Sequence, residues 1–299
     1  MKKPKIAVLT LNWNGSQHLR YFLKSVSQLD YTNFFTLVVD NGSSDDSIKF
    51  VKSKYPDCLI IENGKNLGYS KGFNKGINYA IENGAEYVLI TNNDVILHRD
   101  IIKEGISLFQ KDSEIGYMSG KVYNFDNKNR FQYAGGRLQN KYDGLNRGEG
   151  ELDIGQYEKI EYFDYMDDVC VLVKSDMIKE IGAYDEDFFF DYEETEWNYR
   201  IRKNKFKIVY NPKMKLWHRL HGSSKGINYT PFTLFCHWRG KTLFLYKTKL
   251  GYSKFWSMLF HLFFETPAKS IVFVKNNNTH LIPSLFKGLL SGYKRIVQL

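Results

Sequence analysis

The chain has 299 residues, of which 43% are hydrophobic and 25% charged, a composition that excludes wholesale disorder. Its length is sufficient for a large α/β domain with an appendage. Its three cysteines, Cys58, Cys170 and Cys236, are far apart, which argues against a zinc site or disulfide framework and favours a reducing cytoplasm. The net charge of +9 is uneven, because residues 201–299 hold 18 Lys and Arg against one acid, Glu265. An anionic partner surface is therefore expected for the C-terminal part.

Short apolar runs alternate with amphipathic segments along the first third. The run 6–11 is too short for the apolar core of a signal peptide and is expected to be a first strand. Further strands are predicted at 35–39, 59–61 and 87–90, with helices at 19–26, 45–54 and 69–82. This order predicts a Rossmann-like α/β fold with a doubly wound, mainly parallel sheet, whose ligands bind beyond the carboxyl ends of the strands.

The pattern changes further along. Residues 123–165 are rich in Gly, Asn and aromatic residues and are expected to form an irregular excursion. The spacing then predicts a strand at 169–173, helices at 175–181 and 193–203, a short strand at 206–210, and a loop around His218. We expect a catalytic domain over 1–229 and a helical, basic and aromatic extension over 230–299.

Polar clusters follow the first four strands and should converge. Asp40 lies at a strand end before a Gly turn, where its carboxylate could accept a hydrogen bond from the base or ribose of a nucleoside. The same residues could instead form an Asx-turn that caps the next helix. Gly68 and its amide neighbours open a helix and would let a diphosphate approach, yet a glycine can equally serve a tight turn. Asp94, in the sequence Asn92-Asn93-Asp94, could bind Mg²⁺ or Mn²⁺ through its carboxylate. Alternatively, the three residues simply form a turn.

Two later clusters offer catalytic groups. Four acids lie within residues 191–196, directly after an aromatic run. A carboxylate buried there would have the raised pKa that a general base requires. Alternatively, the acids would only stabilise the first turn of a helix, and Glu196 is spaced to pair with Arg200. His218 and His221 lie three apart, so that one of them could complete a metal site with Asp94 while Arg219 neutralises a leaving diphosphate.

Read in order, TLNWNG, VVDNGSSDDS, NLGYSKGFNKGI, LITNNDV, FFFDYEETEWNYRIRK and WHRLHGSS resemble the family 2 glycosyltransferases of the GT-A fold. The resemblance is strongest to rhamnosyltransferase-like members that build surface polysaccharides, and it covers residues 5–249. As an ordered set these motifs are specific.

The resemblance implies roles for matching positions. It places the nucleotide-sugar donor against Thr10, Asn12, Asp40, Asn66, Gly68, Asn74, Asn92, Asn93, Gly135, Gly136 and Arg219. It implies metal binding by Asp94 and His218, with His221 as a substitute, and it makes Glu194 of the Glu193-Glu194 pair the catalytic base. Two departures are visible: the family's DxD element reads Asn-Asn-Asp, and Glu194 replaces the usual Asp.

The segment 255–264 is strongly apolar, but Glu265 and Pro267 cut it short of the roughly 20 residues that span a bilayer. With lysines around it, it fits a helix lying on an anionic membrane; a packing or homodimer helix is the alternative. Nucleic acid is not expected as a partner, because no nucleic-acid module is present and the first 200 residues are acidic.

These features predict an inverting glycosyltransferase at the inner face of the cell membrane. Its expected donor is a dTDP- or UDP-sugar, with rhamnose as the leading sugar, and its acceptor is a saccharide, lipid-linked by preference. The alternatives are an inactive nucleotide- or glycan-binding scaffold and a sugar nucleotidylyltransferase, which would want a basic Gly-rich loop where this chain has Asn12-Trp13-Asn14-Gly15.

Overall fold

The computed structural model describes residues 3–139, 143–219 and 229–299. One half of its central sheet is parallel, in the order β3-β2-β1-β4. These strands and the helices between them agree with the sequence expectation: β1 (Ile6–Asn12), α1 (Ser16–Val26), β2 (Phe34–Asp40), α2 (Ser47–Lys54), β3 (Leu59–Glu62), α3 (Tyr69–Glu82) and β4 (Tyr87–Asn92).

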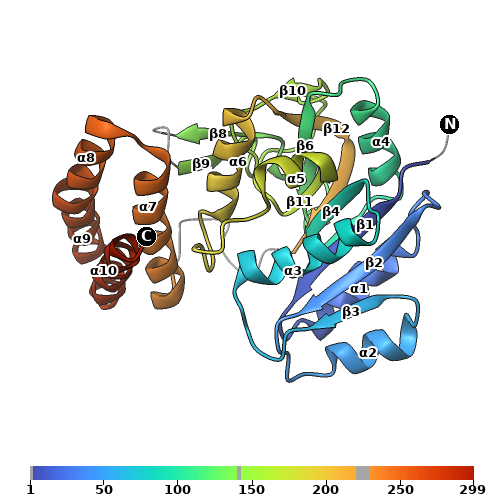
Figure 1. Cartoon of the computed structure of the whole chain (residues 1–299), viewed down its shortest axis with the longest axis horizontal. Coiled ribbons are helices and arrows are strands. Elements are labelled where there is room, and N and C mark those ends of the chain that lie inside the picture. The colour runs from blue at the N-terminus through green and yellow to red at the C-terminus, as the bar shows by residue number, and fades with distance from the viewer. Residues whose placement is uncertain (1–2, 140–142, 220–228) are drawn as a thin grey trace.

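The sheet is buried on both faces, which is why its strands read as continuous apolar runs. Ile6 and Val8 of β1 join a core with Phe22 of α1, whereas the alternate residue Leu9 packs with Phe73 of α3 on the opposite face. The helices therefore cover both faces, and the doubly wound prediction is confirmed (Figure 1).

The other half of the sheet is mixed. β11 (Cys170–Lys174) runs antiparallel between β4 and β6 (Ile115–Asn124), and β12 (Lys207–His218) then runs parallel to β6. The remaining elements of the body are short: β5 (Val95–Leu97), α4 (Ile101–Phe109), β7 (Phe131–Tyr133), β8 (Gly136–Gln139), β9 (Asp143–Asn146), β10 (Glu161–Tyr162), α5 (Ser175–Ile181) and α6 (Glu193–Lys203).

Two expectations were wrong. The segment 123–165 is irregular only in part, because β7 pairs with β6, β8 and β9 form a hairpin, and β10 pairs with β12. The predicted short strand 206–210 is in fact β12, which continues to His218, so this histidine ends a strand and does not lie in a loop. Pro212 lies inside this strand, where a register shift between Tyr210 and Lys215 accommodates it.

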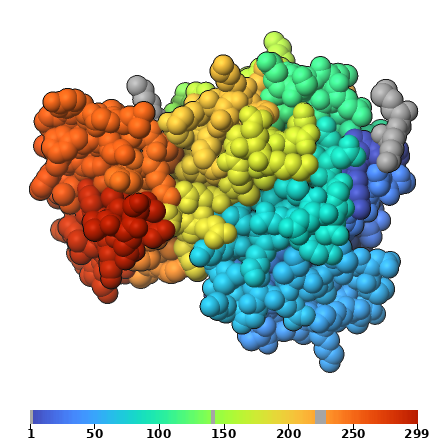
Figure 2. Space-filling model, viewed as in Figure 1, coloured from blue at the N-terminus to red at the C-terminus, as the bar shows by residue number. Residues whose placement is uncertain are grey.

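The C-terminal extension is helical, as expected, and forms a lobe beside the α/β body (Figures 1 and 2). A small core of its own holds the lobe together, around Trp238, Leu285 and Leu289. None of the described helices is both long and apolar enough to cross a membrane. The lobe consists of α7 (Pro231–Thr248), α8 (Gly251–Phe260), the π-helical turn η1 (His261–Glu265), α9 (Thr266–Lys275), the 3₁₀ turn η2 (Thr279–Leu281) and α10 (Ile282–Val297).

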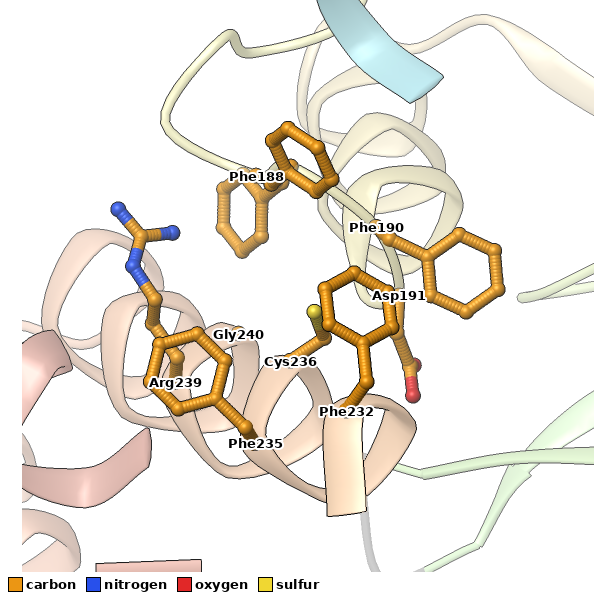
Figure 3. A pocket seen from close by; sticks show the side chains of 9 residues that line it. Phe188, Phe190, Asp191, Phe232, Phe235, Cys236, Arg239 and Gly240 are labelled. Atoms are coloured by element: carbon orange, nitrogen blue, oxygen red, sulfur yellow. The ribbon is translucent and has the colours of Figure 1, made fainter. Parts of the chain in front are cut away.

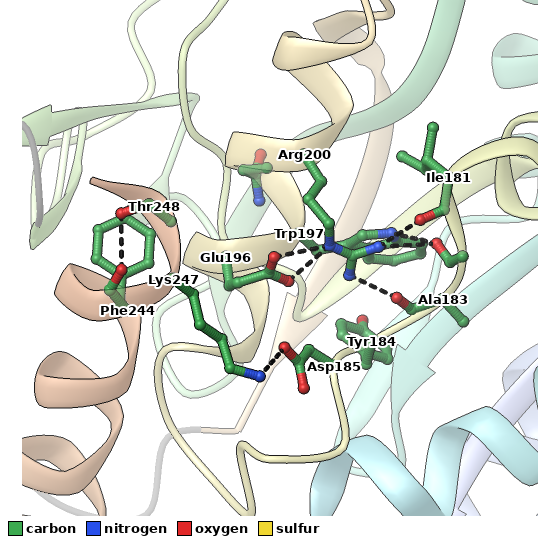
Figure 4. Close-up of polar contacts among 12 residues, drawn as sticks. Ile181, Ala183, Tyr184, Asp185, Glu196, Trp197, Arg200, Phe244, Lys247 and Thr248 are labelled. Carbon is green, nitrogen blue, oxygen red and sulfur yellow. Dashed lines mark hydrogen bonds and ion pairs between the residues drawn. The ribbon is translucent and has the colours of Figure 1, made fainter. Parts of the chain in front are cut away.

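Ion pairs fasten the lobe to the loop before α6. Lys247 of α7 lies 2.5 Å from a carboxylate oxygen of Asp185 (Figure 4). It lies equally close to Asp187, and Arg295 of α10 lies 2.7 Å from Asp187. The helix that follows is itself clamped by the expected Glu196–Arg200 pair, at 2.7 Å. Part of the positive charge of the extension is thus neutralised within the molecule.

Gly288 sets the approach of α10 to α7, since an added Cβ would lie 2.4 Å from the carbonyl oxygen of Phe235. Helix propensity alone would make Gly288→Ala stabilising by about 1 kcal/mol. We expect the opposite sign, a loss of about 1–3 kcal/mol from overpacking, in urea unfolding followed by circular dichroism. Leu290→Ala, on the exposed face of α10, is the control and should change stability far less; equal stability of Gly288→Ala and the parent would contradict this packing.

Candidate active site

Asn12 joins three strand ends at the carboxyl edge of the sheet. Its Nδ2 donates to Asp40 Oδ1 and to Ser47 Oγ, both at 3.1 Å, and its Oδ1 accepts from Asn93 Nδ2 at 2.8 Å. Asn12 is fully buried, so these bonds fix the loops after β1, β2 and β4 against one another. The predicted convergence of these polar clusters is what the structure shows.

The Asp40 carboxylate is occupied by donors of its own chain. Its Oδ1 accepts from Asn12 and from Ser43 Oγ at 2.5 Å, and its Oδ2 accepts from the main-chain N–H groups of Gly42 and Ser43 at 3.1 and 2.9 Å. Asp40 therefore shapes the turn, and a nucleobase would have to replace the Ser43 hydroxyl. Thr10 Oγ1, which is buried without a hydrogen-bond partner, remains free.

Gly68 allows both a tight turn and the close approach of the loop before α6. Its N–H donates to Asn66 Oδ1 at 2.8 Å, its φ is +84°, and a Cβ at this position would lie 2.6 Å from the Phe189 carbonyl oxygen. The next N–H, of Tyr69, donates to that same carbonyl at 2.6 Å, which ties the predicted donor loop to the loop before α6.

Asn74 lies apart from this group. Its amide makes two bonds to the main chain of Tyr184, at 2.8 and 3.0 Å, and thereby positions the segment that follows α5. The expected donor contact of Asn74 stays a prediction. Asn92 is closer to the loops, since its Oδ1 lies 3.4 Å from the hydroxyl of Tyr69.

Asp94 and His218 come together from distant parts of the chain. Asp94 Oδ1 lies 3.0 Å from His218 Nε2, while His218 Nδ1 lies 2.7 Å from Gln132 Oε1. Because an amide oxygen only accepts, Nδ1 carries a ring proton in this arrangement, and Nε2 faces the carboxylate. The main-chain N–H of Arg219 donates to the Asp94 carbonyl at 2.9 Å, while the guanidinium group of Arg219 lies over the Phe125 ring, 4.9 Å from its centroid.

This pair fits a divalent cation. Asp94 Oδ1 is buried and receives no properly aligned hydrogen bond despite its nearness to the ring. Burial alone would raise the pKa of Asp94, but the His218 ring lowers it, so the carboxylate stays ionised. Adjacent ligands of an octahedral ion with bonds of about 2.1 Å lie about 3 Å apart, close to the observed spacing. No group of three or more potential metal ligands occurs among the described residues, and His221 lies outside them.

Glu194 lies in a cluster of buried acids. Its Oε1 accepts from the hydroxyls of Tyr165 at 3.1 Å and Thr195 at 2.9 Å. Burial, and then the charges of Asp168 and Asp191, raise the pKa of Glu194 to about 8. This is the environment that a general base working near neutral pH requires.

Glu193, beside it, is more deeply buried, and its Oε2 has no hydrogen-bond partner. Burial and the charge of Glu194 raise the pKa of Glu193 well above its usual value. The two predicted catalytic acids are therefore neighbours with unequal surroundings, and Glu194 is the one with hydroxyl donors around it.

Asp167 and Asp168 also belong to the cluster, and the sequence reasoning missed them. Asp168 accepts from the Tyr184 hydroxyl at 2.7 Å, and burial with the nearby Asp167 raises its pKa to about 7. Burial raises the pKa of Asp167 too, against a lowering from its hydrogen bond with Asn146 and from the charge of His218. Two acids directly before an apolar strand were the available signal.

The segment that leads into α6 is strained. Asp191 and Tyr192 have φ of +72° and +73°, left-handed values that are uncommon for residues with side chains. His237 Nδ1 lies 2.9 Å from Asp191 Oδ2, and a Cβ on Gly240 would lie 2.8 Å from the Asp191 carbonyl oxygen. Helix α7 of the extension therefore holds the start of the helix that carries Glu194.

Gly135 and Gly136 stand on the Glu194 side. A Cβ on Gly135, whose φ is +96°, would lie 2.6 Å from the Phe163 ring, and one on Gly136 would lie 3.0 Å from the Tyr165 carbonyl oxygen. They support the tyrosine that donates to Glu194. Their expected donor contact stays a prediction.

Two cavities flank the start of α6. One, of about 660 Å³, is lined by Glu194, the β8–β9 hairpin and residues of α7 and α9. The other, of about 360 Å³, is almost wholly apolar, and Figure 3 shows aromatic side chains of the loop before α6 and of α7 gathered around it, with Arg239 at one side. The body and the extension thus both contribute to the surroundings of Glu194.

Known proteins with related sequences are glycosyltransferases by name. A hexosyltransferase of low-salt glycan biosynthesis, Agl10 from Haloferax volcanii, is 25% identical over 68% of this chain and 63% of its own. An N-acetylglucosaminyl-diphospho-decaprenol L-rhamnosyltransferase of Mycobacterium tuberculosis is 23% identical over 74% of this chain and 78% of its own. The chain thus spans slightly less than two thirds of the first relative.

The solved structure of GalNAc-T7 with UDP, GalNAc and Mn²⁺ superposes with a TM-score of 0.67 over 84% of this chain and 49% of the other, at 12% identity, which confirms the GT-A fold. The sequence model of Glycosyl transferase family 2 matches residues 7–168, more than half of the chain. The chain therefore belongs to glycosyltransferase family 2.

Proposed function

We propose that the protein is an inverting glycosyltransferase that moves a sugar from a dTDP- or UDP-sugar to a saccharide acceptor in polysaccharide synthesis. The observation that carries this proposal is the pairing of two distinct centres: a cation-binding pair at the strand ends and a carboxylate with a raised pKa beside an open cavity. A nucleotide-binding scaffold would need the first centre only.

Glu194 is the proposed general base. Its carboxylate takes the proton of the acceptor hydroxyl as that oxygen attacks the anomeric carbon, opposite the departing nucleoside diphosphate. Tyr165 and Thr195 orient the carboxylate, and the acids around it keep its proton affinity high enough for the transfer. Rhamnose is the leading donor sugar, supported by the name of the mycobacterial relative.

Asp94 and His218 are the proposed ligands of Mg²⁺ or Mn²⁺, and the Mn²⁺ named with the GalNAc-T7 structure supports this assignment. A bound divalent ion would neutralise the charge of the leaving diphosphate. Gln132 would fix the ring of His218 for this role. Arg219, whose main chain is bonded to Asp94, is proposed to add positive charge near the diphosphate.

The acceptor is proposed to be lipid-linked, and the extension to lie on the inner face of the cell membrane. Aromatic side chains of α8 and η1 stand exposed: Tyr252, Phe255, Trp256, Phe260, Phe263 and Phe264. Such a face, with lysines beside it, suits the boundary between lipid headgroups and acyl chains.

Glu194→Gln should lower the rate of sugar transfer by about 10²–10⁴-fold, because the amide cannot accept the proton. Nucleotide binding should persist, and Glu180→Gln, an exposed acid of α5, should leave transfer unchanged. Since only the deprotonated base is active, the parent rate should rise with pH through a pKa of about 8. A near-normal rate for Glu194→Gln would reassign the base, and no transfer by the parent with any of a panel of nucleotide sugars would favour the scaffold.

Asp94→Asn and His218→Ala should each weaken Mn²⁺ binding in the presence of UDP by about 10-fold or more, because each removes a ligand. Electron paramagnetic resonance of free Mn²⁺ measures this without any turnover. Asp126 is an exposed acid shortly after the end of β6, and Asp126→Asn serves as the matched control. Unchanged Mn²⁺ affinity in both site variants would remove the metal from this position.

The membrane proposal is tested by sedimentation with phosphatidylglycerol vesicles. The parent should bind, binding should weaken with added salt, and the double variant Phe260→Ser, Phe264→Ser should lose it, because those stacked rings supply apolar contact. Ile160→Ser, an exposed apolar residue of the body, should bind like the parent. Equal sedimentation of the double variant and the parent would contradict the assigned surface.

A further inference from the structure

The 660 Å³ cavity beside Glu194 has walls from both parts of the molecule. Glu194 and Tyr192 come from the start of α6, Lys241 comes from α7, and Lys269 and Val272 come from α9. A hydroxyl that gives its proton to Glu194 therefore enters a space whose far wall is the C-terminal lobe. An acceptor whose hydroxyl reaches Glu194 would therefore meet the lobe with the rest of its structure.

The charges of the inner wall are mostly paired. Lys241 is buried and lies between two acids, 3.1 Å from Asp143 and in direct contact with Glu265. The other oxygen of Glu265 contacts His261 Nδ1 at 2.8 Å. These groups are saturated by their own chain, and so is Asp191, through His237.

Lys269 is different. It is half-buried, and its Nζ lies 5.4 Å from the centroids of the Tyr229 and Phe273 rings, which hold the ammonium group in place. No carboxylate among the described residues lies within ion-pair distance of this nitrogen, in contrast to Lys241. Burial, and then the positive charge of Lys241, lower the pKa of Lys269, as expected for an ammonium group without a full counter-charge.

We propose that Lys269 binds a phosphate group of the acceptor while the acceptor hydroxyl lies at Glu194. This inference rests on the proposed function and names the substrate class: a saccharide linked to phosphate. The same helix supplies a route for an attached lipid, because Ala268 and Val272 of α9 also line the cavity and Val272 is 43% exposed. Reacting sugar, phosphate and apolar chain would then lie in succession from Glu194 to the surface of α9.

The test is calorimetric titration with geranyl phosphate, inorganic phosphate and geraniol, in EDTA and excess UDP so that the donor site does not take the phosphate. The parent should bind geranyl phosphate, and Lys269→Gln should weaken that binding by about 10- to 100-fold, the effect of losing a charge-assisted hydrogen bond. Lys269→Arg should retain most of the affinity. Lys254→Gln, which removes another lysine stacked on a ring but outside the cavity, should bind like the parent.

Tighter binding of geranyl phosphate than of inorganic phosphate would support a lipid phosphate, and equal binding would support a phosphorylated saccharide without lipid. Equal affinity of Lys269→Gln and the parent for geranyl phosphate, or no binding of either phosphate by the parent, would overturn the inference. UDP binding with Mn²⁺ is measured in the same proteins and should not change. Loss of UDP binding in the parent would instead count against the proposed function, so the two failures are distinguishable.

Discussion

The loop between α5 and α6 is the constraint on which the rest of the site depends. Its Phe189 carbonyl accepts the N–H of Tyr69 from the donor loop, and its acids Asp185, Asp187 and Asp191 pair with basic residues of α7 and α10. The two left-handed residues at its end then lead directly into the helix that carries Glu194. Strain of this kind persists only where surrounding contacts enforce it, and here both the donor side and the extension supply them. The extension is consequently part of the active-site support.

The acids near Glu194 act on stability and chemistry in opposite ways. Burial raises the pKa values of Glu193, Glu194 and Asp168, because their ionised forms would be poorly solvated and would repel one another. Groups with pKa values raised in the folded state bind more protons when folded, so this cluster stabilises the protein most at low pH and progressively less as pH rises through those pKa values. The same elevation gives Glu194 its capacity as a base. Glu194 also lines the 660 Å³ cavity between the body and the lobe, where an acceptor hydroxyl could reach it under the proposed function.

The sequence predicted much of this arrangement because local patterns govern it. Apolar runs with helical spacing between them gave the parallel half of the sheet, and the polar residues after each strand had to meet at one edge. The mixed half was harder: β8, β9 and β10 consist of short, polar, glycine-rich stretches whose pairing depends on partners far along the chain. Asp168 was missed for a related reason, because only tertiary packing buries it among other acids. The basic tail was interpreted as a surface for anionic partners, but Lys241, Lys247 and Arg295 pair with carboxylates of the body, which composition alone could not reveal.

The central claim is that loops remote along the chain form one transferase site, with the sheet edge for the donor and the cavity at Glu194 for the acceptor. The most direct measurement is a crystal structure with an unreactive analogue of UDP- or dTDP-rhamnose and Mn²⁺. The account predicts the nucleoside at the ends of β1 and β2, the ion between the diphosphate and the Asp94–His218 pair, and the anomeric carbon facing Glu194. A nucleotide bound elsewhere, or an anomeric carbon directed away from the cavity, would contradict it.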